Sequence, residues 1–252
     1  DPSQDVAVVT ESDERFWLGV DASRDDRWIL IAAGSKITSE FRLLSTDDPE
    51  GEPRVVAPRR QGVEYDVEPA GDRLLIVHND GAEDFELAEA PLTATSHTEW
   101  APVIPHRQGV RILAVSAYAS HAVVSLRRDG LTGLHVMPRD VGGNLAAGSD
   151  IAFDEPLYVV YAPGESEFET ATIRVGYASL LTPDSIYDYH LTTRELILLK
   201  RTPVLDDPRF GSYQPDNYIQ ERGWATAADG TQVPLSIVRR ADIPLDGSAP
   251  AL

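Results

Sequence analysis

The side chains best suited to nucleophilic catalysis in this sequence are serines that follow a glycine. The nearest candidates for a catalytic serine are in Gly164-Glu165-Ser166-Glu167, Gly211-Ser212-Tyr213 and Gly247-Ser248-Ala249. A serine held on a sharp strand-to-helix turn of the type G-x-S-x-G can act as the nucleophile of a hydrolase. The second glycine is missing in all three places, so we expect these serines to lie in ordinary loops.

Histidines and carboxylates offer no metal site by their spacing. None of the histidines forms H-x-H or H-E-x-x-H, the spacings that bring two ligands to one ion. The acidic turns at 25–26 and 47–52 do not follow the D-x-[DN]-x-[DN]-G pattern of a calcium loop. We therefore expect no metal and no cofactor. The histidines are His78, His97, His106, His121, His135 and His190.

The amino-acid composition excludes several classes of binding partner. The 252 residues carry 22 Lys+Arg against 41 Asp+Glu, a formal net charge of −19, and no cysteine. This charge argues against nucleic acid and anionic membranes as partners, and no apolar run approaches the ~18–20 residues of a membrane span. The lack of cysteine excludes disulfides and thiol nucleophiles and fits a cytoplasmic protein. Since the only methionine is Met137 and the first residue is Asp1, we expect a piece of a longer chain.

The elements that must position any site are short strands in a repeating order. In each of four units two apolar strands are joined by a polar turn, and a third short strand follows. The third strands begin near residues 41, 85, 134 and 186, which gives a period of ~40–50 residues. In the last unit we expect strands at 173–175, 179–181 and 186–189. No long helical periodicity accompanies them.

Short strands with this period predict the blades of a β-propeller, an all-β fold in which each small sheet buries its faces against its neighbours. A β-sandwich is the alternative, but it does not require a period near 50 residues. After the fourth unit, residues 201–218 are rich in Pro, Asp and Tyr and read as a linker. Strands at 221–227 and 232–238 follow, joined by a turn whose Asp229-Gly230 pair favours a hairpin.

Four stretches of the chain resemble the prolyl oligopeptidase family of serine peptidases, and specifically its oligopeptidase B-like branch. The most specific is Tyr218–Arg240, followed by Ser179–Tyr189, with weaker support from Glu11–Phe16 and Thr38–Glu40. The resemblance implies about four blades of a seven-bladed gating propeller at residues 1–200, a hinge at 201–218, and the first strands of a truncated α/β-hydrolase domain at 219–252.

That resemblance also implies a function for the longer protein. It would be a cytoplasmic serine oligopeptidase that hydrolyses short peptides, after Lys or Arg, with a catalytic triad beyond Leu252. This chain alone should be inactive, and its partners would be peptides and its own hydrolase domain. Carboxylates at 150–155 and 165–169 would line a funnel for basic peptides, or simply form a solvated rim. The alternative function is a stand-alone propeller that serves as a binding scaffold.

Hinge residues are the best candidates for a functional role within the chain. We expect Glu221 and Arg222 to form charge-assisted pairs across the propeller–hydrolase interface, and Asp229 and Gly230 to fix the hairpin. Such contacts would control domain opening and thereby substrate entry. The opposing interpretation of Arg222 is an ordinary surface residue.

Overall fold

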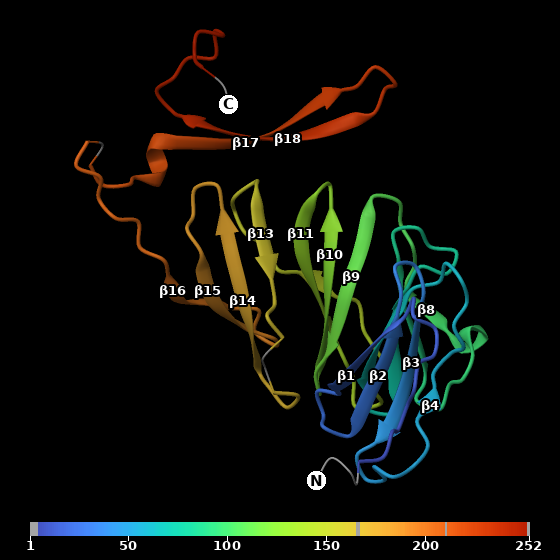
Figure 1. Cartoon of the computed structure of the whole chain (residues 1–252). Helices are drawn as coiled ribbons and strands as arrows, with labels where there is room; N and C mark the ends of the chain where they lie inside the picture. Colours follow the sequence, from blue (N-terminus) through green and yellow to red (C-terminus); the bar gives the residue numbers. More distant parts are fainter. Residues whose placement is uncertain (1–4, 165–166, 210, 251–252) are drawn as a thin grey trace. The chain divides into compact units, whose positions relative to one another are not determined.

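The computed structural model describes residues 5–164, 167–209 and 211–250 (Figure 1). Four sheets of four strands and one two-stranded sheet make up this part of the chain. The first sheet contains β1 (Trp17–Ala22), β2 (Trp28–Gly34), β3 (Ser39–Ser45) and β4 (Arg54–Val55), and the second contains β5 (Tyr65–Ala70), β6 (Arg73–His78), β7 (Glu86–Pro91) and β8 (Ala101–Ile104). The third contains β9 (Val110–Ala117), β10 (His121–Arg128), β11 (Leu131–Pro138) and β12 (Ser149–Asp150). The fourth contains β13 (Tyr158–Tyr161), β14 (Thr172–Ser179), β15 (Ser185–His190) and β16 (Leu196–Arg201), and the last is the ribbon of β17 (Tyr218–Thr226) and β18 (Gln232–Arg240).

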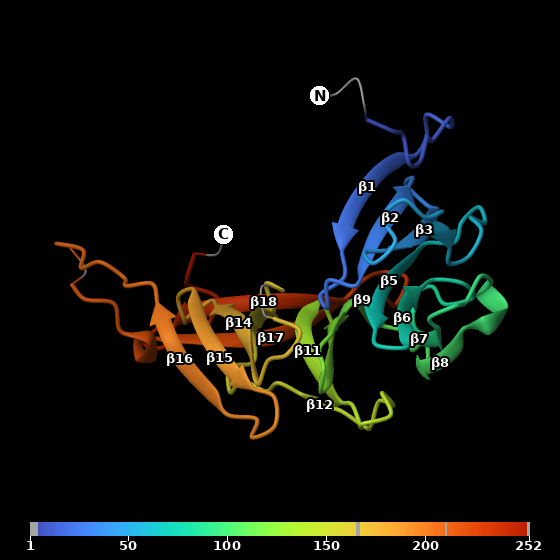
Figure 2. The same cartoon turned by 90° about the horizontal axis from the view of Figure 1, so that it is seen from below.

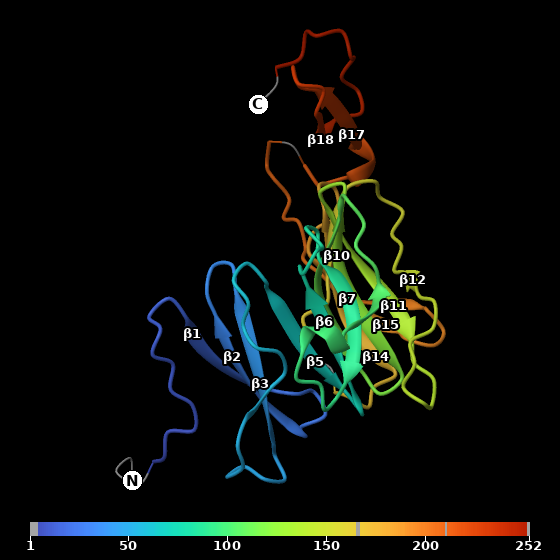
Figure 3. The same cartoon turned by 90° about the vertical axis from the view of Figure 1, so that its right-hand side faces the viewer.

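Strands follow one another in chain order within each four-stranded sheet, as expected for propeller blades. Figure 3 shows β1, β2 and β3 side by side in the first sheet, and Figure 2 shows the same arrangement for β14, β15 and β16. Two short 3-10 helices complete the described elements, η2 (His97–Glu99) and η3 (Pro215–Asn217). No helix in the described ranges has the length and apolar character needed to cross a membrane.

The chain divides into two compact units. The first comprises Asp1–Leu126, His135–Ser149 and Ser166–Thr170, and the second comprises Arg127–Leu134, Asp150–Glu165 and Ala171–Leu252. The third blade contributes residues to both units.

In the first unit, both faces of strand β6 are buried against neighbouring blades. Leu74 and Ile76 belong to a hydrophobic cluster with Leu30 and Leu43 of the first blade. The alternate residues, Leu75 and Val77, belong to a second cluster with Ile112 and Val124 of the third blade. Because successive side chains of a strand point to opposite faces, a continuous apolar run becomes buried on both sides. The second blade is thus stabilised by both neighbours.

Polar contacts at the blade seams of the first unit use main-chain groups. The hydroxyl of Tyr65 donates to the Ala57 carbonyl (2.7 Å) and accepts from the Phe41 N–H (2.8 Å). Arg54 donates to the carbonyls of Leu92 and Ala94. Burial raises the pKa of Tyr65 to about 12, so its hydroxyl stays protonated at neutral pH.

The guanidinium of Arg139 makes a similar contact between the second and third blades. It donates to the carbonyls of Ala70 (2.7 Å) and Tyr118 (2.9 Å). Each of these bonds satisfies a main-chain acceptor at the end of a strand or in the turn that follows a strand.

The expected strands at 173–175 and 186–189 are present, but the strand expected at 179–181 was wrong. Ser179 ends β14, and residues 180–182 form a turn in which the Ser179 hydroxyl accepts hydrogen bonds from the N–H groups of Leu181 (2.9 Å) and Thr182 (2.7 Å). Serine favours turns through this kind of local bond. The first strand of the same blade, β13, was missed.

Candidate functional site

The terminal ribbon of the second unit carries all four residues that the sequence singled out. Strands β17 and β18 pair antiparallel from Tyr218↔Arg240 to Thr226↔Gln232, so the expected hairpin is present and its strands are longer than expected. At its turn, Gly230 has φ +87° and Asp229 accepts a hydrogen bond from the Thr231 N–H (3.0 Å). Bonds from Thr231 lower the pKa of Asp229, which keeps its carboxylate ionised as a turn acceptor.

Arg222 connects the ribbon to a turn of the third blade. Its Nη2 donates to the main-chain carbonyl of Asp129, and its Nη1 donates to the Ser236 hydroxyl on β18 (3.2 Å). The Asp129-Gly130 turn joins β10 to β11, with positive φ at both residues (51° and 77°). A Cβ added at Gly130 would lie 3.3 Å from Arg222 Nη2, so the glycine permits this close approach.

Glu221, in contrast, bonds within the ribbon. Its carboxylate pairs with Arg239 of β18, with N···O distances of 2.9 and 3.0 Å. The described contacts therefore place the two adjacent residues in different roles. Glu221 stiffens the ribbon, whereas Arg222 reaches another element.

A second attachment lies at the base of the ribbon, on the turn after β14. The Tyr213 hydroxyl donates to the Leu181 carbonyl (2.6 Å), and its ring stacks on Tyr218 with a centroid distance of 5.7 Å. Gln220, 7% exposed, directs its Nε2 toward the Ser179 hydroxyl at 3.5 Å. Within the part of the chain that the structure describes, the ribbon of the second unit is thus held at these two points, and of the two only the Arg222 contact involves a charged group.

Comparison with known proteins shows the family to which the chain belongs. Residues 1–202 match the family model described as the prolyl oligopeptidase N-terminal β-propeller domain. The chain belongs to the prolyl oligopeptidase family. Dipeptidyl aminopeptidase BI of Pseudoxanthomonas mexicana is 34% identical over 99% of this chain and 33% of its own length, and Protease 2 of Moraxella lacunata is 31% identical over 100% and 35%.

Among solved structures, the closed form of oligopeptidase B from Trypanosoma brucei, with covalently bound antipain, matches with a TM-score of 0.86 and 31% identity. The match covers 97% of this chain and 35% of that one. The chain spans about a third of the length of these relatives. The resemblance to the oligopeptidase B-like branch of the family and the β-propeller fold are thereby confirmed.

The carboxylates expected to line a funnel are partly engaged with their own blades. In the second unit, Asp150 pairs with Arg128 (3.3 Å), and Glu155 accepts a hydrogen bond from the Tyr177 hydroxyl. Burial and the nearby Glu155 raise the pKa of Tyr177, which keeps the hydroxyl a donor. Glu165 and Ser166 lie outside the described residues.

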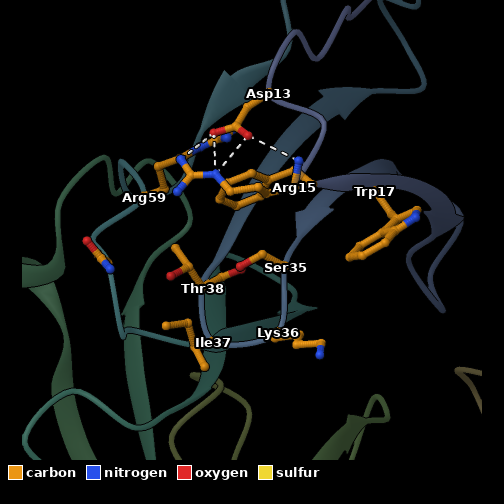
Figure 4. A pocket seen from close by; sticks show the side chains of 10 residues that line it. Asp13, Arg15, Trp17, Ser35, Lys36, Ile37, Thr38 and Arg59 are labelled. Carbon is orange, nitrogen blue, oxygen red and sulfur yellow. Dashed lines mark hydrogen bonds and ion pairs between the residues drawn. The ribbon is translucent and has the colours of Figure 1, made fainter.

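A pocket of about 460 Å³ lies at the start of β1 in the first unit (Figure 4). Arg15 bonds to the carboxylate of Asp13, and Arg59 stacks on Phe16 at 4.0 Å and pairs with Glu11 and Glu40. The Ser35 hydroxyl donates to the Thr38 carbonyl (3.2 Å), and no histidine is among the described lining residues. Ser35 thus has no histidine among the described lining residues to activate it as a nucleophile.

Residues 5–164, 167–209 and 211–250 contain no group of three or more His, Cys, Asp or Glu side chains arranged to hold a metal ion. Sequence reasoning singled out Arg222 but missed the residue that it contacts, Asp129, and the contacts of Tyr213 and Gln220 at the base of the ribbon. The Asp129-Gly130 pair is itself a hairpin signal. Nothing in the linear order, however, indicates that a residue 93 positions away binds it.

Proposed function

We propose that this chain is the substrate-gating propeller portion of a serine oligopeptidase that hydrolyses short peptides, with a preference for cleavage after Lys or Arg. Its catalytic triad lies outside residues 1–252, so the chain alone is inactive. Residues 201–218 form the hinge, and residues 219–252 begin the α/β-hydrolase domain. The longer protein works in the cytoplasm, with peptides and its own hydrolase domain as partners.

The observation that carries this proposal is the similarity to oligopeptidase B over nearly the whole chain, rather than over the blades alone. A scaffold built only of blades has no need for the ribbon β17–β18 after its last blade. The absence of G-x-S-x-G from the sequence agrees with a nucleophile located elsewhere.

Within this function, Arg222 acts as a positioning residue of the gate. Its guanidinium ties the start of the hydrolase domain to the Asp129-Gly130 turn of a propeller blade. A hydrogen bond from a charged donor contributes about 1.5–3 kcal/mol. That is enough to change an equilibrium between open and closed domains about tenfold or more.

The test is Arg222→Ala in the full-length protein, with Arg240→Ala as the matched control, because Arg240 pairs only locally with Asp242 among the described contacts. We expect small-angle scattering to show a more open enzyme for Arg222→Ala, and kcat/KM for peptides to change several-fold. The triad should still react normally with a small acylating inhibitor. Scattering curves and kcat/KM values equal to those of the control would contradict the gating role.

Substrate preference is tested separately with peptide libraries. The full-length protein should cleave peptides after Lys and Arg at least about tenfold faster than after Pro or apolar residues. Equal rates for all of these residues would contradict the basic preference and leave the gating role intact. Failure to hydrolyse any peptide would overturn the proposed activity itself.

A further inference from the structure

Glu68 lies where three blades of the first unit meet. It belongs to β5 of the second blade, and its Oε1 accepts a hydrogen bond from the Ala117 N–H at the end of β9 (2.8 Å). Arg24, in the turn between β1 and β2, places its Nε 3.8 Å from the same oxygen. The Arg24 guanidinium also lies over the Tyr118 ring, 4.7 Å from the centroid. One carboxyl group therefore contacts both neighbouring blades.

The surroundings of Glu68 disfavour its ionised form. Its side chain is 20% exposed and borders a cavity of about 350 Å³ that is also lined by Asp21 and Asp66. Burial raises the pKa of Glu68 to about 7, although the Ala117 N–H and Arg24 oppose the shift, and Asp66 and Asp25 add repulsion. The cavity gives protons a route to the group.

Among the residues that the structure describes, a second arginine also reaches this junction. Arg139 approaches from the end of β11 and donates to the carbonyls of Tyr118 and Ala70. Desolvation raises the pKa of the neighbouring Asp66, with a further contribution from Asp21. Arginine keeps its charge at all relevant pH values, and Asp66 is exposed to solvent. Glu68 is therefore the carboxyl group that can change charge within a contact between blades.

We propose that Glu68 is a proton-sensitive link that loosens the junction of the first three blades as pH rises through neutrality. The neutral carboxyl group accepts the Ala117 N–H without placing a charge beside Asp66. Ionisation places a negative charge in a largely buried position, and Arg24 at 3.8 Å compensates for it only in part.

The direction of this pH dependence follows from the linkage between protonation and folding. The folded protein holds the proton of Glu68 more tightly than the unfolded chain does, because its pKa in the folded protein lies above the ordinary glutamate value of 4.5. This stabilisation is complete below pH 4.5 and is lost as pH rises through about 7. The junction is accordingly tight in mild acid and looser in mild base.

The decisive variant is Glu68→Gln, which keeps a carbonyl oxygen for the Ala117 N–H and cannot ionise. The quantity to measure is the melting temperature of the full chain, parent and variant, from pH 5 to pH 8.5. The variant should match the parent near pH 5 and exceed it by about 4 °C or more at pH 8. Hydrogen exchange of β5 and β9, corrected for intrinsic rates, should increase with pH in the parent and not in the variant.

Glu89→Gln is the matched control, since Glu89 lies in the same blade and pairs with Arg73 (3.0 Å). It should keep the parent's pH dependence between pH 6 and 8. The proposal is overturned if Glu68→Gln keeps that dependence too. If Glu68→Gln does not fold, NMR titration of the Glu68 carboxyl carbon in the parent decides, and a midpoint below about pH 5.5 overturns the proposal.

Discussion

The second blade and the terminal ribbon are both built from apolar strands, yet their surroundings differ. In β6, Leu74, Leu75, Ile76 and Val77 are at most 3% exposed. In β18, apolar residues are 40–48% exposed. They are Val233, Leu235, Ile237 and Val238. The contrast shows that apolar strand character does not itself provide burial, because burial depends on neighbours at both faces.

The largest difference in stability is expected when an isoleucine is replaced by alanine in β6 and, separately, in β18. Ile76→Ala removes side-chain atoms from a fully buried site and should lower the free energy of unfolding by about 3 kcal/mol. Ile237→Ala, at a site that is 40% exposed, should cost less than about 1 kcal/mol. Urea unfolding of both variants measures the difference. Equal costs would mean that the ribbon is as tightly packed as the blade.

A smaller effect should follow from the loss of one hydroxyl at a blade seam. Tyr65→Phe leaves the Phe41 N–H and the Ala57 carbonyl without their partner, so we expect a loss of about 1–2 kcal/mol. Tyr161→Phe is the control, because Tyr161 is 51% exposed and should change stability by less than about 0.5 kcal/mol. Indistinguishable unfolding curves for the two variants would show that the seam bond contributes nothing.

The smallest effect should be confined to the ribbon. Gly230 has φ +87° and open space at its Cβ position, so Gly230→Ala should cost about 1 kcal/mol through backbone strain alone. Gly19→Ala also meets open space but has no positive φ, and it should be neutral within about 0.5 kcal/mol. Hydrogen exchange should show faster opening of β17 and β18 only for Gly230→Ala. Equal protection in the two variants would argue against a strained turn.

Blade strands could be located from the sequence where apolar and turn residues alternate plainly. The run Leu74–Val77 marked β6, and Asp229-Gly230 marked the hairpin. The fourth blade was harder because Ser179–Leu181 is apolar enough to read as a strand. Local hydrogen bonds to the Ser179 hydroxyl decide the conformation there, and a pattern of hydropathy does not contain them.

The contacts of the candidate site could be predicted only in part. Arg222 was singled out for a charge-assisted pair, but its acceptor on the third blade is the main-chain carbonyl of Asp129, and Glu221 pairs inside the ribbon. If the acceptor were a carboxylate, the sequence could be searched for an Asp or Glu able to pair with Arg222. A carbonyl belongs to every residue, so the acceptor at Asp129 becomes visible only once the fold brings it near.

Because every residue has a main-chain carbonyl, the arginine hydrogen bonds at the blade seams tolerate substitutions of the residues that accept them. Arg54 and Arg139 bind carbonyls at positions 70, 92, 94 and 118, and a carbonyl persists whatever side chain occupies the position. Mutation on the accepting blade therefore cannot delete the bond without moving the backbone. For these hydrogen bonds only the arginine must be retained, whereas the apolar clusters of the first unit still require apolar side chains from both blades.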